Sequence, residues 1–205
     1  MSRVVLDIET DSKHTVIWCA VLNDIDTGEV TCHTNATGLR AALDIAEQVI
    51  GHNLVAFDKW HLQNLWGIQI PLTKCYDTLI VSRLMRPDLQ GGHSLEAWGN
   101  RLNFKKSDYP TAYREKFQND YYPSKEWNEP DMPMLIAYCK QDTRVTARLL
   151  KHLEKQLSSQ KFVGECIELE HQVAEIIAEQ VRNGVLIDQK ALTTLYAEVQ
   201  DEVAK

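Results

Sequence analysis

The sequence lacks any apolar run long enough to cross a membrane, and its first residues lack the basic and apolar regions of a signal peptide. These absences predict a cytoplasmic protein with no membrane partner. Cysteine is also sparse, with five residues standing singly along the chain. Scattered cysteines in odd number favour reduced thiols over a disulfide framework or a zinc site.

Basic residues are in the minority, since 22 lysines and arginines stand against 29 acidic residues and the net charge is −7. This balance disfavours a high-affinity, sequence-specific nucleic-acid binder. It does not exclude an enzyme that acts on phosphodiesters, because two bound divalent cations would bring the −7 to about −3. Contact with nucleic acid would then depend on local basic patches.

What is present is the pattern of an α/β protein of 205 residues, enough for one well-packed domain with a short appendage. Stretches of β-forming residues predict strands at 3–10, 14–22, 29–34 and 49–53. Apolar residues at helical spacing predict helices at 39–50, 57–66, 78–85, 131–157 and 162–183, with further helices starting at 95 and 189. A helix between the third and fourth strands implies a parallel crossover, so the sheet is mixed.

Two regions interrupt this pattern. Residues 103–130 contain several tyrosines, asparagines and prolines, which predicts a surface excursion of loops and short helices. The polar triplet 158–160 predicts a break between the two longest helices. The final helix reaches the end of the sequence without a capping residue, so we expect the sequence to be part of a longer chain.

The predicted first strand ends in two carboxylates at alternate positions, Asp7 and Glu9, which the strand period of two places on one face. Such a pair of like charges suits magnesium or manganese, because carboxylate oxygens are the ligands these cations prefer. Two solvated acids at a strand end are the alternative.

Two further acids lie at positions where a carboxylate could bind a metal ion. Asp58 follows a strand-to-helix junction, where the helix dipole favours negative charge, although an ordinary helix-start acid would look the same. Asp142 lies on the apolar face of the helix at 131–157 and shares that face with Tyr138, four residues earlier. A buried, unpaired carboxylate costs several kcal/mol, so Asp142 needs a partner or a metal.

Together these residues resemble the DEDD superfamily of 3′–5′ exonucleases, and the tyrosine marks its DEDDy branch. The three motifs occur in the family order: Asp7-Ile8-Glu9-Thr10, Asn53-x-x-x-Phe57-Asp58 and Tyr138-x-x-x-Asp142. Residues 75–84 and 93–102 are similar to the proofreading domain of phage family A DNA polymerases. The similarity covers most of residues 1–157.

The resemblance implies a ribonuclease H-like fold, a mixed five-stranded sheet flanked by helices. It implies a 3′–5′ exonuclease domain at 1–160 and the start of a helical polymerase domain at 161–205, with the rest of the polymerase in a longer parent chain. The implied substrate is single-stranded DNA or a frayed primer 3′ end, and the products are deoxynucleoside monophosphates. A phage-encoded chain would act in the host cytoplasm.

The resemblance also implies two Mg²⁺ or Mn²⁺ ions, which activate water and stabilise the leaving oxygen. Asp7 would bridge both ions. Glu9 and Asp142 would complete the site that holds the attacking water, and Asp58 would support the second ion. Tyr138 would orient the water with Glu9, since a tyrosine that titrates near 10 is a poor general base.

Other positions are candidates for substrate contact or for support of the fold. Thr10 could offer its backbone to the terminal nucleotide, and Asn53 could hold the sugar-phosphate or brace the loop before Asp58. We interpret Asp77 as a helix N-cap. Three histidines without metal-ligand spacing are given structural or solvent roles: His52, His61 and His93. The candidates for phosphate contact are Lys59, Arg83, Arg86, Arg101, Lys105 and Lys106, and those for base stacking are Tyr109, Tyr113, Tyr121 and Tyr122.

Two alternatives remain open at the level of the sequence. Exoribonucleases of the same superfamily share the three motifs, although the similarity near Trp98 and after Gly184 favours the polymerase branch. A catalytically silent module that binds DNA or a partner protein is the second alternative. Such modules usually lose at least one acid, and here all four are present.

Overall fold

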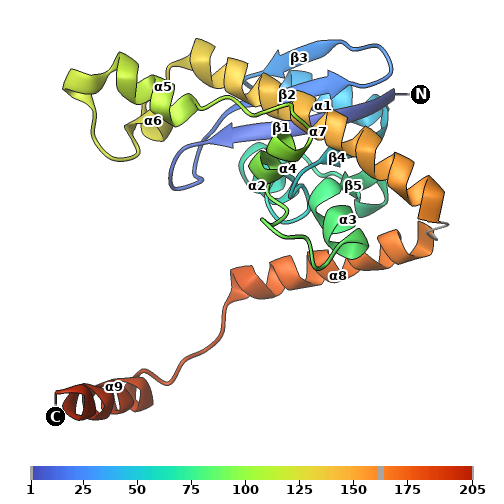
Figure 1. Cartoon of the computed structure of the whole chain (residues 1–205). Helices are drawn as coiled ribbons and strands as arrows, with labels where there is room; N and C mark the ends of the chain where they lie inside the picture. Colours follow the sequence, from blue (N-terminus) through green and yellow to red (C-terminus); the bar gives the residue numbers. More distant parts are fainter. Residues whose placement is uncertain (1, 161–163, 205) are drawn as a thin grey trace.

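The computed structural model describes residues 2–160 and 164–204 (Figure 1). Within them, a mixed sheet has the strand order β3-β2-β1-β4-β5. The strands are β1 (Ser2–Thr10), β2 (Ile17–Asp24), β3 (Val30–His33), β4 (Ala46–Gly51) and β5 (Cys75–Asp77). β1 lies in the middle, antiparallel to β2 and parallel to β4. The predicted α/β fold with a mixed five-stranded sheet is confirmed.

The alternation of side chains along β1 divides the core into two layers. Leu6 and its neighbours at even positions pack against α1 (Ala36–Ile45) and α2 (Asp58–Trp66). Val5 packs on the opposite face against Leu150 of the long helix α7 (Met132–Gln160), which crosses the sheet in Figure 1. Because side chains alternate along a strand, Asp7 and Glu9 also face α7.

The remaining helices, apart from α9, lie around this core. They are α3 (Thr78–Met85), α4 (Leu95–Arg101), α5 (Tyr109–Lys116), α6 (Lys125–Asn128), α8 (Gly164–Asn183) and α9 (Gln189–Val203), with 3₁₀ turns at Leu72–Lys74 and Gln118–Asp120. α8 packs against α3, whereas α9 stands away from the domain at the end of an extended segment (Figure 1). Over the described residues, no helix combines the length and the apolar character that a membrane span requires.

Several predicted boundaries were wrong. The helix expected at 39–50 ends at Ile45, and β4 begins at once, because pairing with β1 buries Val49 and Ile50 in the sheet. The second strand starts at Ile17 instead of residue 14, since the Asp11 carboxylate accepts hydrogen bonds from backbone N–H groups in the turn before it. β5 was not predicted at all. A strand of three residues is too short to show an alternating pattern.

The end of α7 also differs from expectation. The helix continues through 158–160, where a break was predicted. Ser158 and Ser159 direct their hydroxyls to backbone carbonyls of the preceding turn, so these polar side chains are satisfied within the helix. The predicted start of the next helix at Phe162 lies outside the described residues.

The excursion at 103–130 is confirmed as short helices and loops, but two of its tyrosines are core residues. Tyr109 and Tyr113 are 3% and 2% exposed. Their hydroxyls donate to the backbone carbonyls of Glu126 and Glu129 at 2.7 and 2.8 Å. Local packing, the alternative to base stacking for these candidates, therefore describes both tyrosines, because their rings are packed within the protein.

Candidate active site

The site is built around the carboxyl end of β1, where Asp7 and Glu9 face α7. Glu9 is buried, and Asp7 keeps partial access to solvent. The Cys139 thiol on α7 donates to Asp7 Oδ2 at 3.2 Å. One oxygen from each acid and the sulfur of Cys139 lie within 4.8 Å of one another. The strand period brought the two acids together, and the crossing of α7 brought the thiol to them.

The Asp58 side chain approaches the carboxyl end of β1 from α2, on the opposite face of the sheet from α7. It is the first residue of α2 and only 4% exposed. Its Oδ1 accepts a hydrogen bond from the Ile8 backbone N–H at 3.1 Å, which fixes the strand-to-helix junction against β1. The carboxyl is close enough to Asp7 for the two charges to repel.

Asp142 and Tyr138 enter from α7, one turn apart. Asp142 is 3% exposed, and its Oδ2 lies 2.6 Å from Nζ of Lys106. The same ammonium sits 4.9 Å from the centre of the Tyr138 ring. The other carboxylate oxygen, Oδ1, is buried and finds no hydrogen-bond partner in residues 2–160 or 164–204. Lys106 therefore pairs with one oxygen of this carboxylate, Oδ2, and leaves Oδ1 available to a ligand.

The acids strongly perturb one another. Burial, followed by the charge of Asp142, raises the pKa of Asp7 to about 7. Burial, followed by the charge of Asp7, raises the pKa of Glu9 and of Asp58 well above their usual values. These shifts mean that the site does not stabilise several negative charges by itself.

Two groups beside the acids are held in one protonation state. Burial and then Asp142 raise the pKa of Tyr138, so its hydroxyl stays protonated near neutral pH. Burial opposes the charge on Lys106, but Asp142 and Tyr138 together raise its pKa. A protonated hydroxyl and a permanent ammonium thus border the carboxylates.

The donor set fits a hard divalent cation. Four carboxyl groups with raised pKa values meet at one strand end, and Asp142 offers an unpartnered buried oxygen. Carboxylate oxygens are the preferred ligands of magnesium and manganese, and a doubly charged cation would offset the mutual repulsion. Asp7, Glu9, Asp58 and Asp142 are the residues that could hold such ions.

Of the two predicted substrate residues, Thr10 lies beside this cluster, and Asn53 lies at the start of the turn that leads to Asp58. Thr10 is buried, and its hydroxyl contacts His14 Nδ1 at 2.8 Å. Thr10 lines a hollow of about 330 Å³ next to Glu9, with Phe57 and Trp127 among its walls. Asn53 has a left-handed backbone with φ of 72°, and its carbonyl accepts the Phe57 N–H at 3.0 Å. Asn53 thus braces the turn that leads to Asp58.

Asp77 lies behind this turn. Its Oδ1 accepts from the Leu79 N–H at the start of α3, as predicted for an N-cap. The same carboxylate also accepts from the backbone N–H groups of Asn53 and Val55. The predicted cap is confirmed, and it additionally ties β5 to the loop before Asp58.

Sequence reasoning missed two neighbours of the acids. Lys106 was one of six candidates for phosphate contact, yet nothing in the sequence paired it with Asp142. Cys139 adjoins Tyr138, but its position on the helix gave no sign that its thiol reaches Asp7. Among the other candidates, Lys59 forms an ion pair with Glu175 and Arg101 donates to the Gln90 carbonyl.

Comparison with known proteins points to one group of relatives. No protein-family model matches the chain. The DNA-directed DNA polymerase of Escherichia phage T7 is 29% identical over 250 residues, and that of Enterobacteria phage T3 is 30% identical over 251. Each alignment covers 96% of this chain and 35% of the relative. This chain is similar in sequence to both phage DNA polymerases. It spans about a third of their length.

Solved structures agree on the fold. Brucella melitensis NrnC superposes with a TM-score of 0.60 at 16% identity, over 91% of this chain and 90% of that one. A nuclease in its apo form gives 0.57 at 19% identity, over 91% and 89%. The family B DNA polymerase of Pyrobaculum calidifontis gives 0.53 at 16% identity, over 75% and 24%. The fold is the ribonuclease H-like fold.

Proposed function

We propose that this chain is a metal-dependent 3′–5′ exonuclease that hydrolyses DNA from the 3′ end and releases deoxynucleoside monophosphates. The observation that carries the proposal is the meeting of Asp7, Glu9, Asp58 and Asp142 at one strand end, with Asp142 Oδ1 unpartnered. Similarity to two phage DNA polymerases supports DNA as the substrate and proofreading as the role.

The four carboxylates would hold two Mg²⁺ or Mn²⁺ ions, which supply an activated water and stabilise the leaving 3′-oxygen when bound. The protonated Tyr138 hydroxyl would orient the attacking water together with Glu9. The hydrogen bond from the Ile8 N–H keeps the Asp58 carboxylate in place, and the Cys139 thiol does the same for Asp7. The chain's own contribution is therefore to fix the ligands and the water.

Two hollows border the acids and would receive the DNA strand. The hollow of about 330 Å³ beside Glu9 has Phe57 and Trp127 in its walls and suits the terminal nucleoside, with Thr10 offering its backbone. A second hollow of about 540 Å³ lies beside Tyr138 and Lys106. The ammonium of Lys106 would face the phosphates there, and Asn53 would brace the loop or meet the sugar-phosphate.

We also propose that residues 1–160 form the exonuclease domain and that 161–205 begin a helical polymerase domain in a longer parent chain. The relatives support a longer parent chain because this chain matches only 35% of their length. α8 lies in the second part but packs on the first, where His171 accepts the Asp77 N–H at 2.7 Å. It would connect the exonuclease domain to the polymerase domain.

The decisive experiment is digestion of labelled single-stranded DNA with Mg²⁺ or Mn²⁺, with a chelator as control. The Asp7→Ala, Glu9→Ala double variant should lose at least about a thousandfold in rate, because charge stabilisation by the ions is lost. Asp26→Ala, Glu29→Ala removes the same charge from an exposed turn and should be neutral. A double variant that digests at the parental rate would contradict the proposal.

Two further arms separate the alternatives. A matched RNA oligonucleotide should be cut poorly, and equal turnover on RNA and DNA would favour an exoribonuclease. A parent protein that binds DNA but digests neither would be a silent module. Tyr138→Phe should slow digestion by about a hundredfold or less while metal binding is kept, and an unchanged rate would remove the tyrosine from the mechanism.

A further inference from the structure

The outer face of α7 carries a stripe of basic residues that the proposed active site does not use. Its members are Lys140, Arg144, Arg148, Lys151 and Lys155. At about 100° per residue these five side chains fall within an arc of about 80°, and they extend over about 22 Å of helix. The stripe stands out in a chain of net charge −7.

Over residues 2–160 and 164–204, these cations have no anionic partners. No residue of the stripe forms an ion pair with a carboxylate anywhere in the described parts of the chain, whereas Lys106, Lys116 and Lys125 all do. Like charges one turn apart destabilise a helix by about 0.2–0.5 kcal/mol per pair. The face therefore keeps unneutralised charge at some cost to stability, which suits an anionic ligand.

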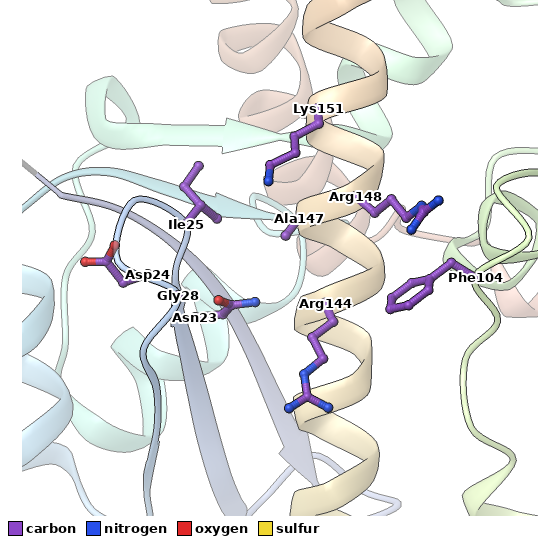
Figure 2. Close-up of a pocket in the computed structure, with 9 residues that line it drawn as sticks. All are labelled: Asn23, Asp24, Ile25, Gly28, Phe104, Arg144, Ala147, Arg148 and Lys151. Atoms are coloured by element: carbon purple, nitrogen blue, oxygen red, sulfur yellow. The ribbon is translucent and has the colours of Figure 1, made fainter.

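The middle of the stripe borders a hollow of about 470 Å³. Its lining residues are Asn23, Asp24, Ile25, Gly28, Phe104, Arg144, Ala147, Arg148 and Lys151 (Figure 2). Figure 2 shows Arg148 and Phe104 facing each other on one side of α7, with the turn after β2 on the other. Asp24 Oδ1 accepts the backbone N–H groups of Asp26 and Thr27 at 2.9 Å each, so this oxygen is occupied within its own turn.

Phe104 connects this hollow to the proposed active site. It lies two residues before Lys106, which contacts Asp142, and Gln141 on α7 holds the Lys105 carbonyl between them at 2.8 Å. Arg148 follows Asp142 by six residues, about 9 Å along the helix axis. A nucleic-acid strand whose 3′ end lies among the carboxylates could reach the hollow by following this loop along α7.

We propose that Arg144, Arg148 and Lys151 bind the phosphate backbone of single-stranded nucleic acid, upstream of the 3′ end held in the active site. The proposal rests on the proposed function. Phe104 packs against the apolar cluster between α3, α4 and α7, and the Arg148 guanidinium lies 5.1 Å from the centre of its ring. The guanidinium held there forms a flat platform, and a base can stack on its outer face. Only a single strand offers free base faces to such a platform, so a duplex fits less well.

The test is equilibrium binding of a fluorescent single-stranded oligonucleotide in chelator, measured by anisotropy over a range of salt concentrations. Arg144→Gln, Arg148→Gln, Lys151→Gln should bind more weakly and reduce the log–log salt slope by about 2, since each phosphate contact on a single strand contributes about 0.7. Between 50 and 200 mM salt, the parent should then lose about twentyfold more affinity than the variant.

A matched control removes three exposed cations elsewhere: Arg40→Gln, Arg182→Gln, Lys190→Gln. It should keep the parental slope. Equal slopes in the parent and the α7 variant, or equal losses in both triple variants, would overturn the proposal. Phe104→Leu should lower affinity by about fivefold at an unchanged slope, because stacking carries no charge.

Further arms separate this proposal from the proposed function. With Mg²⁺, the α7 variant should raise KM for a long oligonucleotide and leave kcat unchanged, because the carboxylates are untouched. If the parent digests no DNA, the function fails, yet the salt slope in chelator still decides the binding site. Equal loss on duplex DNA of the same length, or tighter binding of an acidic peptide at the same residues, would contradict a single-strand site.

Discussion

Helices α7 and α9 are both amphipathic, but they differ in what covers their apolar faces. On α7, Leu149 and Leu153 are 0% and 1% exposed because the helix crosses the sheet and meets α4. On α9, Leu192 and Leu195 remain 53% and 56% exposed. The amphipathic pattern therefore predicts both helices, whereas a fixed position, and most of the stability of a helix, needs a partner surface.

α8 lies between these extremes. His171 and Ala178 are buried against the domain, but Ile176 and Val181 on the same helix are 58% and 75% exposed. The carboxylates of the proposed active site all belong to elements packed on at least one face. The difference predicts that substitutions in the two regions have very unequal effects.

The largest contrast should come from the same substitution in both regions. Leu149→Ala should lower the free energy of unfolding by about 3 kcal/mol, because it opens a cavity in a closed core. Leu195→Ala should change it by less than about 0.5 kcal/mol. Urea unfolding of both variants measures this. A comparable loss for Leu195 would show that α9 is packed against a surface in solution.

Metal should stabilise only the region that holds the acids. At a concentration a hundredfold above its dissociation constant, Mg²⁺ should raise the unfolding free energy by about 2.7 kcal/mol. The Asp7→Ala, Glu9→Ala variant should show no such gain, since its ligands are gone. Thermal melts with Mg²⁺ and with chelator provide the comparison, and an equal shift in both proteins would speak against these ligands.

The next effect should come from the contact that holds α8. His171→Phe should cost about 2 kcal/mol, because the buried Asp77 N–H loses the acceptor that it has at 2.7 Å. Gln172→Ala, at the next and exposed position, is the control and should be nearly neutral. Amide exchange in α8 should rise in the first variant alone. Unchanged exchange would mean that other contacts position the helix.

A smaller effect should follow from pH within the N-terminal region. Burial lowers the pKa of His52 to about 4, so the folded protein holds this ring neutral while the unfolded chain protonates it near 6.5. Stability should consequently fall as the pH drops from about 6.5 to 4. The full shift corresponds to about 3 kcal/mol, and the partial solvent access of the ring reduces this to about 1 to 2 kcal/mol. His52→Asn should remove that part of the loss in acid-unfolding curves. Parallel curves for the parent and the variant would rule out a contribution of His52 to the loss of stability in acid.

The sequence predicted those features that depend on local periodicity. Asp7 and Glu9 share a face because of the strand repeat, and Tyr138 and Asp142 because of the helix repeat. The Asp77 cap follows from side-chain chemistry at a helix start. Prediction failed at Ala46, where helical spacing continued but pairing with β1 imposed a strand, and it left open the use of Tyr109, whose ring the tertiary structure buries.

The sequence by itself thus determined which acids lie on which face, and the order of motifs that suggested their use. Only the tertiary structure decided that Lys106 reaches Asp142, that Cys139 donates to Asp7 and that a basic hollow lies along α7. Periodicity relates residues within one element. Contacts between elements depend on how loops run and how helices cross, and a repeat in the sequence carries no information about either.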